Sequence, residues 1–431
     1  MKKISFLFAL CVSAILSLTA CGETVGNVSF DSQEAVDALA EVTTEVSATE
    51  ATTEASTQTV YTEPPVGANL PVNKQVEVYE KITLSELLEG ANVTLDDGDT
   101  LVDTSELGEL EVTVSYSFEG DLYKHPVTYT VKDTTPPVLL NSGEGAYVEV
   151  GTAFDLSDYV GFADNYDKTP ELTYTGTVDT STCGIYSISA VATDSSGNST
   201  PWNLRLIVVN EEPEPEDDNE RRSFDAVTME YAGDNVSFGI DVSKWQGEID
   251  FNAVKNAGCD YVIMRIGTFY DEYAEDTYFA QNLKGAKEAG LDVGVYIYTT
   301  ANSEAEARDN AQWIIDTLDG EKLDFPVVFD WESFSNFQQY EMSIDDLNNY
   351  FLAFADELEN NGYSAMLYSS KNFLNNFWYE HEDYPKWLAH YTRETDYKGE
   401  YSMWQLTCYG RIDGIGGDVD FNILYTDMPM N

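Results

Sequence analysis

Basic residues are scarce in this chain. It contains 22 Lys and Arg residues against 77 Asp and Glu residues, which gives a formal net charge of −55. A protein that binds nucleic acid must neutralise phosphates with basic side chains, so this balance excludes DNA and RNA as partners. Such a charge helps to keep a protein in solution but carries no information about its fold.

Cysteine and histidine are also rare, with 5 Cys and 3 His residues. There is no Cys-x-x-Cys pair, and the His residues do not have the spacing of metal ligands, so the sequence predicts no metal site and no cofactor. Cys183, Cys259 and Cys408 are too widely spaced for a disulfide framework. A bridge between the last two stays open but is not indicated.

The N-terminal segment resembles an export signal. Lys2 and Lys3 precede an apolar run over residues 4–18, and Leu-Thr-Ala-Cys follows at 18–21. The run is too short to favour a permanent membrane span. A Cys after small residues resembles a bacterial lipobox, in which the thiol is lipidated. We therefore expect a signal peptide at 1–20 and a lipid anchor on Cys21 at the outer face of the bacterial cell membrane. The alternative is an ordinary signal with an incidental Cys.

Two segments have the composition of linkers. Residues 21–66 are rich in Thr, Glu, Ala and Ser, and no Lys or Arg occurs between Cys21 and Lys74. Such a segment buries too little apolar surface to fold, so it predicts a disordered tether. Residues 211–230 begin with an acidic stretch that contains Pro, and this predicts a second linker.

An internal repeat lies between these linkers. Val-Asp-Thr-Ser occurs at 102–105 and again at 178–181, an offset of 178 − 102 = 76, and Gly108 and Gly184 keep this offset. Alternating apolar residues follow each copy, which is typical of strands in a β-sandwich. We therefore predict two immunoglobulin-like sandwiches, at 67–132 and 133–210, and the second resembles the immunoglobulin-like modules of bacterial surface proteins. Rigid spacers are the simpler interpretation, and wall or glycan binding is the alternative.

The second copy contains a polar cluster. Asp164, Asn165 and Asp167 have oxygen side chains that could bind calcium. A solvated turn explains the same residues more simply, and we expect a turn.

The remaining part, 231–431, changes pattern, because apolar strand-like runs now alternate with helical ones. The expected helices are 277–289, 304–318 and 344–360. The expected strands are 238–242, 261–266, 293–298, 327–331, 365–368, 387–390, 402–406 and 418–421. This alternation predicts a parallel sheet, and about eight strands predict closure into an irregular TIM-like α/β barrel. We expect incomplete helical cover in its last third.

Carboxylates mark the ends of several expected strands, where barrels of this class place their active sites. Asp330 and Glu332 follow an apolar run at positions i and i+2, so they point to the same side. Two acids held so close cannot both ionise freely, and one becomes a candidate general acid. Asp241 and Asp420 stand at two other strand ends.

Aromatic and amide side chains accompany these acids. The candidates for substrate binding are Trp245, Tyr296, Tyr298, Tyr368, Trp387, Trp404 and Gln405. Acids that protonate a leaving oxygen, with aromatic faces that stack on sugar rings, are what a glycosidase needs. Trp404 or Tyr296 alone would be interpreted as a core residue. The prediction therefore depends on the joint placement of the acids and the aromatic residues at strand ends.

Four motifs in order are similar to those of glycoside hydrolase family 25, the lysozymes of cell-wall turnover. They are Gly-Ile-Asp-Val-Ser-x-Trp-Gln-Gly (239–247), Val-Phe-Asp-Trp-Glu (328–332), Met-Trp-Gln-Leu (403–406) and Gly-Gly-Asp-Val-Asp-Phe-Asn (416–422). The resemblance implies cleavage of the β-1,4 bond from N-acetylmuramic acid to N-acetylglucosamine in peptidoglycan. It implies Glu332 as proton donor, Asp330 as its partner, and Asp241 and Asp420 as the acidic floor.

Two positions depart from the family pattern. Ile297 replaces a residue that is often His, which affects substrate preference more than catalysis. Trp331 is bulkier than the usual aliphatic residue between the acids, but it is expected to point away from the site.

The mechanism stays open between three routes. Carboxyl groups about 5–5.5 Å apart would indicate retention and a wider gap inversion, while a substrate N-acetyl oxygen can also act as the nucleophile. We favour the last route, with Asp330 steadying the amide. The alternative function is a catalytically inactive wall-binding or adhesive surface lipoprotein.

Overall fold

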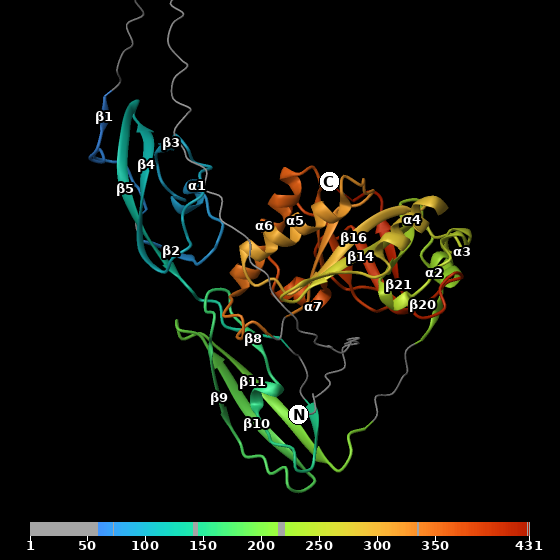
Figure 1. Ribbon diagram of the computed structural model, residues 1–431. Helices are drawn as coiled ribbons and strands as arrows, with labels where there is room; N and C mark the ends of the chain where they lie inside the picture. The colour runs from blue at the N-terminus through green and yellow to red at the C-terminus, as the bar shows by residue number, and fades with distance from the viewer. Residues whose placement is uncertain are drawn as a thin grey trace, which may run out of the picture.

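The computed structural model describes residues 59–71, 73–140, 145–213, 220–333, 336–428 and 430. The expected signal peptide, Cys21 and most of the expected tether lie outside these residues. Figure 1 shows two β-modules and a larger barrel domain, with the second module beside the barrel. Within the described part of the chain, no helix combines the length and apolar character that a membrane span requires.

The first module is built on one sheet with the order β1-β5-β4-β3, and β2 also pairs with β5. Its elements are β1 (Val60–Tyr61), β2 (Lys74–Glu77), α1 (Leu84–Leu87), β3 (Thr94–Leu95), β4 (Gly108–Phe118) and β5 (Asp121–Lys132). Glu119 and Gly120 join β4 to β5, and both have positive φ, as a tight hairpin turn requires. Leu84 and Leu87 of α1 belong to the core of this module. The sandwich predicted for 67–132 is therefore not confirmed.

The second module has two sheets, as a sandwich requires. Its elements are β6 (Val138–Leu139), β7 (Gly145–Glu149), η1 (Leu156–Asp158), β8 (Phe162–Ala163), β9 (Glu171–Thr175), β10 (Gly184–Thr193) and β11 (Ser199–Val209). One sheet has the order β7-β11-β10-β9 and the other pairs β6 with β8. Ile188, Leu204 and Leu206 are almost fully buried in its core.

The predicted repeat has a structural counterpart in the two modules. Gly108 begins β4 and Gly184 begins β10, and each strand forms a long antiparallel hairpin with the next. The repeated motif also folds alike, because the carboxylates of Asp103 and Asp179 accept hydrogen bonds from the backbone N–H and hydroxyl two residues later.

Eight strands form the barrel: β13 (Val236–Val242), β14 (Tyr261–Phe269), β16 (Asp292–Thr299), β17 (Val327–Trp331), β18 (Ala365–Ser370), β19 (Lys386–Ala389), β20 (Met403–Arg411) and β21 (Val419–Tyr425). The helices are α2 (Phe224–Glu230), α3 (Phe251–Asn256), α4 (Phe279–Ala289), α5 (Glu304–Leu318), α6 (Ile344–Asn360) and α7 (Lys371–Asn376), with a 3-10 turn, η2 (Lys244–Gln246). The short strands β12 (Arg222–Ser223) and β15 (Tyr273–Glu275) pair with β20 and β14. No helix separates β19 from β20, so the helical cover thins out late, as expected.

The sheet closes because β21 pairs with both β13 and β20. The pairs from β13 round to β20 are parallel, whereas β21 is antiparallel to both of its neighbours. The prediction of a parallel sheet is therefore wrong for the last strand. A short connection after β20 returns the chain as a hairpin, which can only be antiparallel.

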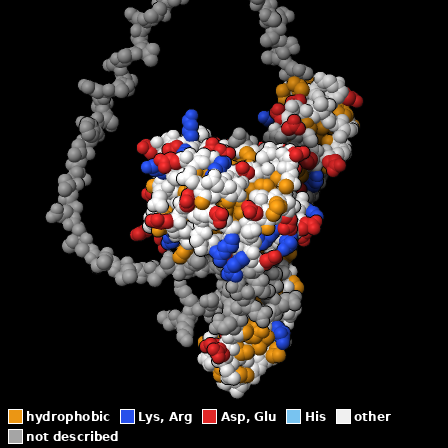
Figure 2. All heavy atoms as spheres, turned by 90° about the vertical axis from the view of Figure 1, so that its right-hand side faces the viewer, with side chains coloured by type: hydrophobic (Ala, Val, Ile, Leu, Met, Phe, Trp, Pro, Cys, Tyr) orange, Lys and Arg blue, Asp and Glu red, His pale blue; other side chains and the backbone are white. Residues whose placement is uncertain are grey.

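Residues 222–230, assigned to a linker by composition, are part of the barrel domain. Phe224 and Val227 of α2 lie in the core between the barrel and its helices. Cys183, Cys259 and Cys408 are all free, so no disulfide joins them. On the face in Figure 2, acidic side chains are spread over the surface with basic side chains among them.

Candidate active site

Side chains of β17 alternate between the barrel interior and the helical layer. Val328 lies in the interior cluster, while Phe329 and Trp331 belong to the core under the helices. Asp330 therefore points into the barrel, and Glu332 follows it on the same side. The indole N–H of Trp331 donates to the carbonyl of Ala301 at 2.8 Å, and Trp331 is fully buried. The sequence prediction for this motif agrees with the structure.

The other two acids come from neighbouring strands. Asp241 on β13 and Asp420 on β21 are directly paired across an antiparallel ladder, so their side chains share the interior face. Asp330 in turn pairs with Tyr298 of β16 on one side and with Tyr368 of β18 on the other. The barrel thus brings four acids from three strands to one end.

A hydrogen-bond network holds Asp241 in place. Its Oδ2 accepts from Nε2 of Gln405 at 2.9 Å and from Nδ2 of Asn422 at 2.7 Å. The indole N–H of Trp387 donates to Oδ1 of Asn422 at 2.8 Å, and the hydroxyl of Tyr368 donates to Oε1 of Gln405 at 2.9 Å. Each member fixes the orientation of the next, so the carboxylate is pre-positioned.

Sequence reasoning gave no role to two residues of this network. Asn422 ends the fourth motif, which was the available signal for it. The hydroxyl of Tyr391 also donates to Oε1 of Gln405, at 3.1 Å, and Tyr391 lies in none of the motifs.

A cation lies close to the acids. Arg265 on β14 donates through Nε and a terminal nitrogen to Asp276 at 2.9 and 2.7 Å, and both residues are largely buried. Burial raises the pKa of Asp330, and the guanidinium opposes this effect by stabilising the ionised form. No sequence motif pointed to Arg265, because a single Arg at a strand end has no distinctive spacing.

Burial keeps these acids protonated to unusually high pH. Desolvation raises the pKa of Glu332 to about 7 and that of Asp241 to about 6, the latter against the hydrogen bonds from Asn422 and Gln405. Desolvation, followed by the charges of Glu332 and Asp241, raises the pKa of Asp330 well above its ordinary range. Desolvation and the charge of Asp241 do the same for Asp420.

Glu332 differs from its neighbours because it stays exposed to solvent although protein atoms surround it. Solvent access to its carboxyl group offsets part of the desolvation that raises its pKa. With four interacting acids, the group as a whole carries fewer than four negative charges near neutral pH. A protonated donor and a carboxylate can therefore coexist in one site.

Only some of the predicted substrate-binding residues are accessible. Trp245 is 47% exposed, and the ammonium group of Lys244 lies 5.1 Å from its ring centre. Tyr298 and Tyr296 are partly exposed, and the ring of Tyr298 lies 5.5 Å from that of the exposed Tyr270. These rings are available to stack on a ligand.

The structure corrects the prediction for Trp404. It is 3% exposed, its indole N–H donates to the carbonyl of His390, and its ring meets Tyr231 edge-on in the outer core. It points away from the site because it alternates with Gln405, which faces the interior.

Three more predicted contact residues are positioning residues instead. Trp387, Tyr368 and Gln405 are 2%, 9% and 3% exposed, and their polar groups are used inside the network around Asp241. They orient the carboxylate and leave the more exposed rings to meet the ligand.

Comparison with known proteins identifies two regions. The model of glycosyl hydrolases family 25 matches residues 240–415, and that of a bacterial surface protein Ig-like domain matches residues 138–208. The second match lies within the two-sheet module.

Individual relatives match the barrel domain at low identity. The chain is 32% identical over 189 residues to the autolytic lysozyme of Clostridium acetobutylicum, covering 43% of this chain and 54% of that protein. It thus spans about half the length of this relative. It is 32% identical over 192 residues to the uncharacterized protein YegX of Escherichia coli K12, covering 43% of this chain and 68% of YegX.

Among solved structures, the bacterial lysozyme from Streptomyces coelicolor is 24% identical, covers 43% of this chain and 90% of its own, and has a TM-score of 0.37. The family model covers three of the four acids, and the fourth, Asp420, lies five residues beyond its last matched position. Through its C-terminal barrel domain, the chain belongs to glycosyl hydrolase family 25.

Proposed function

We propose that this protein is a muramidase that hydrolyses the β-1,4 bond between N-acetylmuramic acid and N-acetylglucosamine in peptidoglycan. The observation that carries the proposal is the group of four acids at one end of the barrel, with Glu332 exposed and Asp330 buried beside it. A glycosidase needs a proton donor and a second carboxylate at the scissile bond, and this group supplies both. The autolytic lysozyme among the relatives supports the same reaction.

Glu332 is the proton donor in this proposal. Its pKa of about 7 leaves much of it protonated near neutral pH, and its exposure lets it reach the glycosidic oxygen of a bound glycan. Protonation of this oxygen turns the departing sugar into a neutral alcohol.

Asp330 steadies the substrate in a substrate-assisted route. Its Oδ1 is buried without a hydrogen-bond partner in the described structure, so it is free to accept the N–H of an N-acetyl group. That hydrogen bond would hold the acetamide while its oxygen attacks the anomeric carbon. Burial and the charges of Glu332 and Asp241 raise the pKa of Asp330, and Arg265 opposes them by stabilising the ionised form that this role requires.

Asp241 and Asp420 complete the acidic floor. Asp241 is oriented by Gln405 and Asn422, and its negative charge would stabilise the positive charge that develops on the sugar ring. Trp245 and Tyr298 would bind the neighbouring sugars through their ring faces.

The rest of the chain would place this barrel in the wall. We infer that both modules are immunoglobulin-like spacers and that the barrel is an irregular TIM-like fold. A lipid on Cys21 would hold the protein at the outer face of the cell membrane, with the tether and the spacers extending the barrel towards peptidoglycan. The match to a surface-protein domain supports an extracytoplasmic location.

Glu332→Gln tests the assignment. Gln keeps the shape of the side chain but cannot give up a proton, so hydrolysis of purified walls should fall by about 10²–10⁴-fold while wall binding persists. Glu288→Gln is the matched control, since Glu288 lies on the outer helix α4 in an exposed ion pair with Lys284. If Glu332→Gln retains a third or more of the wild-type rate, the assignment is wrong.

A further inference from the structure

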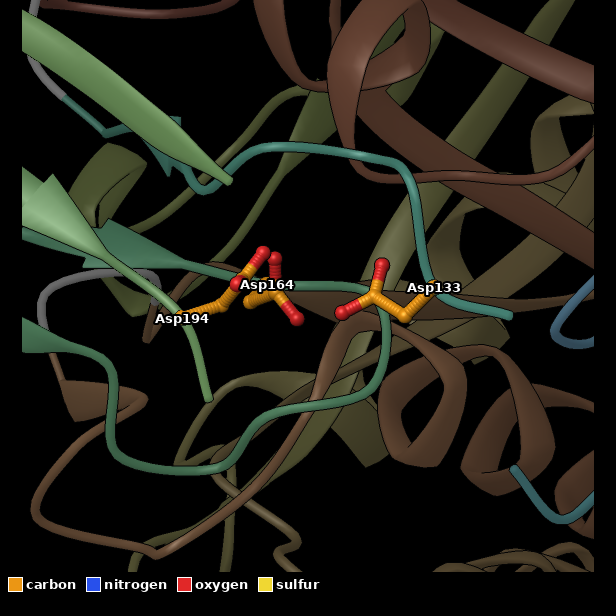
Figure 3. A group of neighbouring side chains, drawn as sticks. All are labelled: Asp133, Asp164 and Asp194. Atoms are coloured by element: carbon orange, nitrogen blue, oxygen red, sulfur yellow. The ribbon is translucent and has the colours of Figure 1, made fainter. Parts of the chain in front are cut away.

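Three aspartates gather away from the barrel site. Oxygen atoms of Asp133, Asp164 and Asp194 all lie within 4.8 Å of one another. Figure 3 shows Asp164 and Asp194 side by side, with Asp133 facing them from another segment. Asp133 precedes the second module, Asp164 follows β8 and Asp194 follows β10, so the fold assembles the group from three places in the chain.

Local hydrogen bonds fix the orientation of each segment. Oδ1 of Asp164 accepts the backbone N–H of Tyr166 at 3.0 Å. Both carboxylate oxygens of Asp194 accept from Asn198, one from its backbone N–H and one from its side-chain amide, each at 2.8 Å. The same side-chain amide donates to the backbone carbonyl of Asp133 at 3.2 Å. Asn198 therefore links the Asp194 segment to the Asp133 segment, and the Asp164 carboxylate is fixed within its own turn.

The cluster is buried and lacks a cationic partner among the described residues. Asp133, Asp164 and Asp194 are 5%, 0% and 6% exposed, so the expectation of a solvated turn at 164–167 is wrong for Asp164. Oδ2 of Asp133, Oδ2 of Asp164 and Oδ1 of Asn165 are buried without a hydrogen-bond partner. The nearby cation of this loop, Lys168, pairs instead with Asp346 on the barrel domain at 2.8 Å.

Helix α6 begins next to this loop, but its dipole contributes only about +0.5 charge, far less than three carboxylates carry. Burial and the neighbouring carboxylates favour the protonated forms of these acids. Burial raises the pKa of Asp164 to about 6, and burial followed by the charge of Asp194 raises the pKa of Asp133. A bound divalent ion would instead lower the pKa values of both residues.

We propose that Asp133, Asp164 and Asp194 bind one Ca²⁺ ion. Oxygen ligands lie about 2.3–2.6 Å from Ca²⁺, so two ligands on opposite sides of one ion are about 4.6–5.2 Å apart. Three oxygens that all lie within 4.8 Å of one another can therefore reach a single ion. An all-oxygen set of carboxylates suits Ca²⁺, whereas Zn²⁺ prefers His and Cys, and Mg²⁺ needs a stricter octahedral geometry.

The ion would stiffen a junction of all three parts of the molecule. The backbone carbonyl of Asp164 accepts the N–H of Ile344, the first residue of α6 in the barrel domain, at 2.7 Å. The ring of the next-but-one residue, Tyr166, lies 5.9 Å from that of Tyr79 in the first module. Asp133 itself belongs to the connection between the two modules. Ca²⁺ would therefore set how the modules and the barrel are held relative to one another.

Calorimetric titration of the full chain with CaCl₂ tests the site. The protein is first stripped with EDTA, and NaCl near physiological strength with excess MgCl₂ suppresses weak binding to the many surface acids. One Ca²⁺ per chain should bind with a Kd of about 10⁻⁴–10⁻³ M or tighter, the range of extracellular modules. Asp164→Asn and Asp194→Asn should each weaken binding at least tenfold.

Asp179→Asn is the matched control. Asp179 lies in the same module and caps a turn through Ser181, but it is outside the cluster, so its removal should leave binding unchanged. Hydrogen exchange on the wild-type chain gives a second readout that needs no variant, because Ca²⁺ should slow exchange around 133–135, 164–167 and 194–198. Failure of the wild type to bind one Ca²⁺ above the Mg²⁺ background, or equal binding by the Asp164 and Asp194 variants, would overturn the proposal.

Discussion

Replacing Asp241 by Asn should stabilise the barrel, although it removes a residue of the proposed site. Asp241 is 7% exposed, and burial raises its pKa from 3.8 to about 6. An acid whose pKa is raised on folding contributes most to stability at pH below 3.8, and this contribution is lost as the pH rises through about 6. Near pH 8 the folded protein therefore bears the full cost of an ionised, buried carboxylate.

The size of the expected gain in stability follows from the shift in the pKa of Asp241. A change of about 2 pKa units at about 1.36 kcal/mol each corresponds to about 3 kcal/mol of lost stability. Asn is uncharged and its side-chain oxygen can still accept from Gln405 and Asn422, so Asp241→Asn should recover about 3 kcal/mol near pH 8. Near pH 5 the gain should be about half as large, because the wild-type carboxyl is then mostly protonated.

Denaturant unfolding followed by tryptophan fluorescence measures this difference, since six of the 7 Trp residues lie in the barrel domain. Asp276→Asn provides the contrast. Asp276 is also buried, but it pairs with Arg265. Its replacement leaves the Arg265 guanidinium buried without this partner. The barrel should therefore be destabilised at both pH values by about 3–5 kcal/mol. A gain for Asp241→Asn that does not change with pH, or a loss near pH 8, would refute the electrostatic reasoning.

Three other predictions address the site and the anchor. Hydrolysis of soluble wall fragments should fall about tenfold per pH unit above about 7, because Glu332 then loses its proton; a rate that stays level to pH 9 would contradict its role as acid. Trp245→Ala should lower kcat/KM on glycans with little change in Tm, whereas Trp404→Ala should lower Tm through loss of a buried side chain, and the reverse pattern would show that the two were misassigned. Cys21→Ala should shift the protein from the membrane fraction to the medium or leave it uncleaved, and unchanged fractionation would exclude Cys21 as the anchor.

The longer helices of the barrel domain were predictable because local rules determine them, whereas the short helices α2, α3 and α7 were not predicted. Residues 304–318 and 344–360 match α5 and α6 at both ends. The second begins at the capping box of Ser343 and Asp346, a signal that depends on neighbouring residues alone. The direction of β21 was missed because the strand predicted at 402–406 ends before β20 does, which hid the short connection to β21.

The part of the active site that lies along a single strand was predictable. Alternation along β17 places Asp330 and Glu332 together and Trp331 opposite. The same rule, applied to β20, would have separated Trp404 from Gln405, which the sequence analysis placed in one site. The prediction for Trp404 was wrong because the residues of the motif were not assigned to the inner and outer faces of the strand.

The assembly of the aspartate cluster could not be predicted from the sequence. Asp133, Asp164 and Asp194 are about thirty residues apart, and each has the appearance of an ordinary turn residue. The fold brings them together and buries them.

Mass spectrometry of the fragments released from purified peptidoglycan by the wild-type protein tests the central claim most directly. Reduction with borohydride before analysis labels the new reducing ends. A muramidase with Glu332 as its acid should yield fragments that end in reduced N-acetylmuramic acid, and Glu332→Gln should yield almost none. Fragments that end in reduced N-acetylglucosamine, or no new reducing ends while the protein sediments with the walls, would contradict the account.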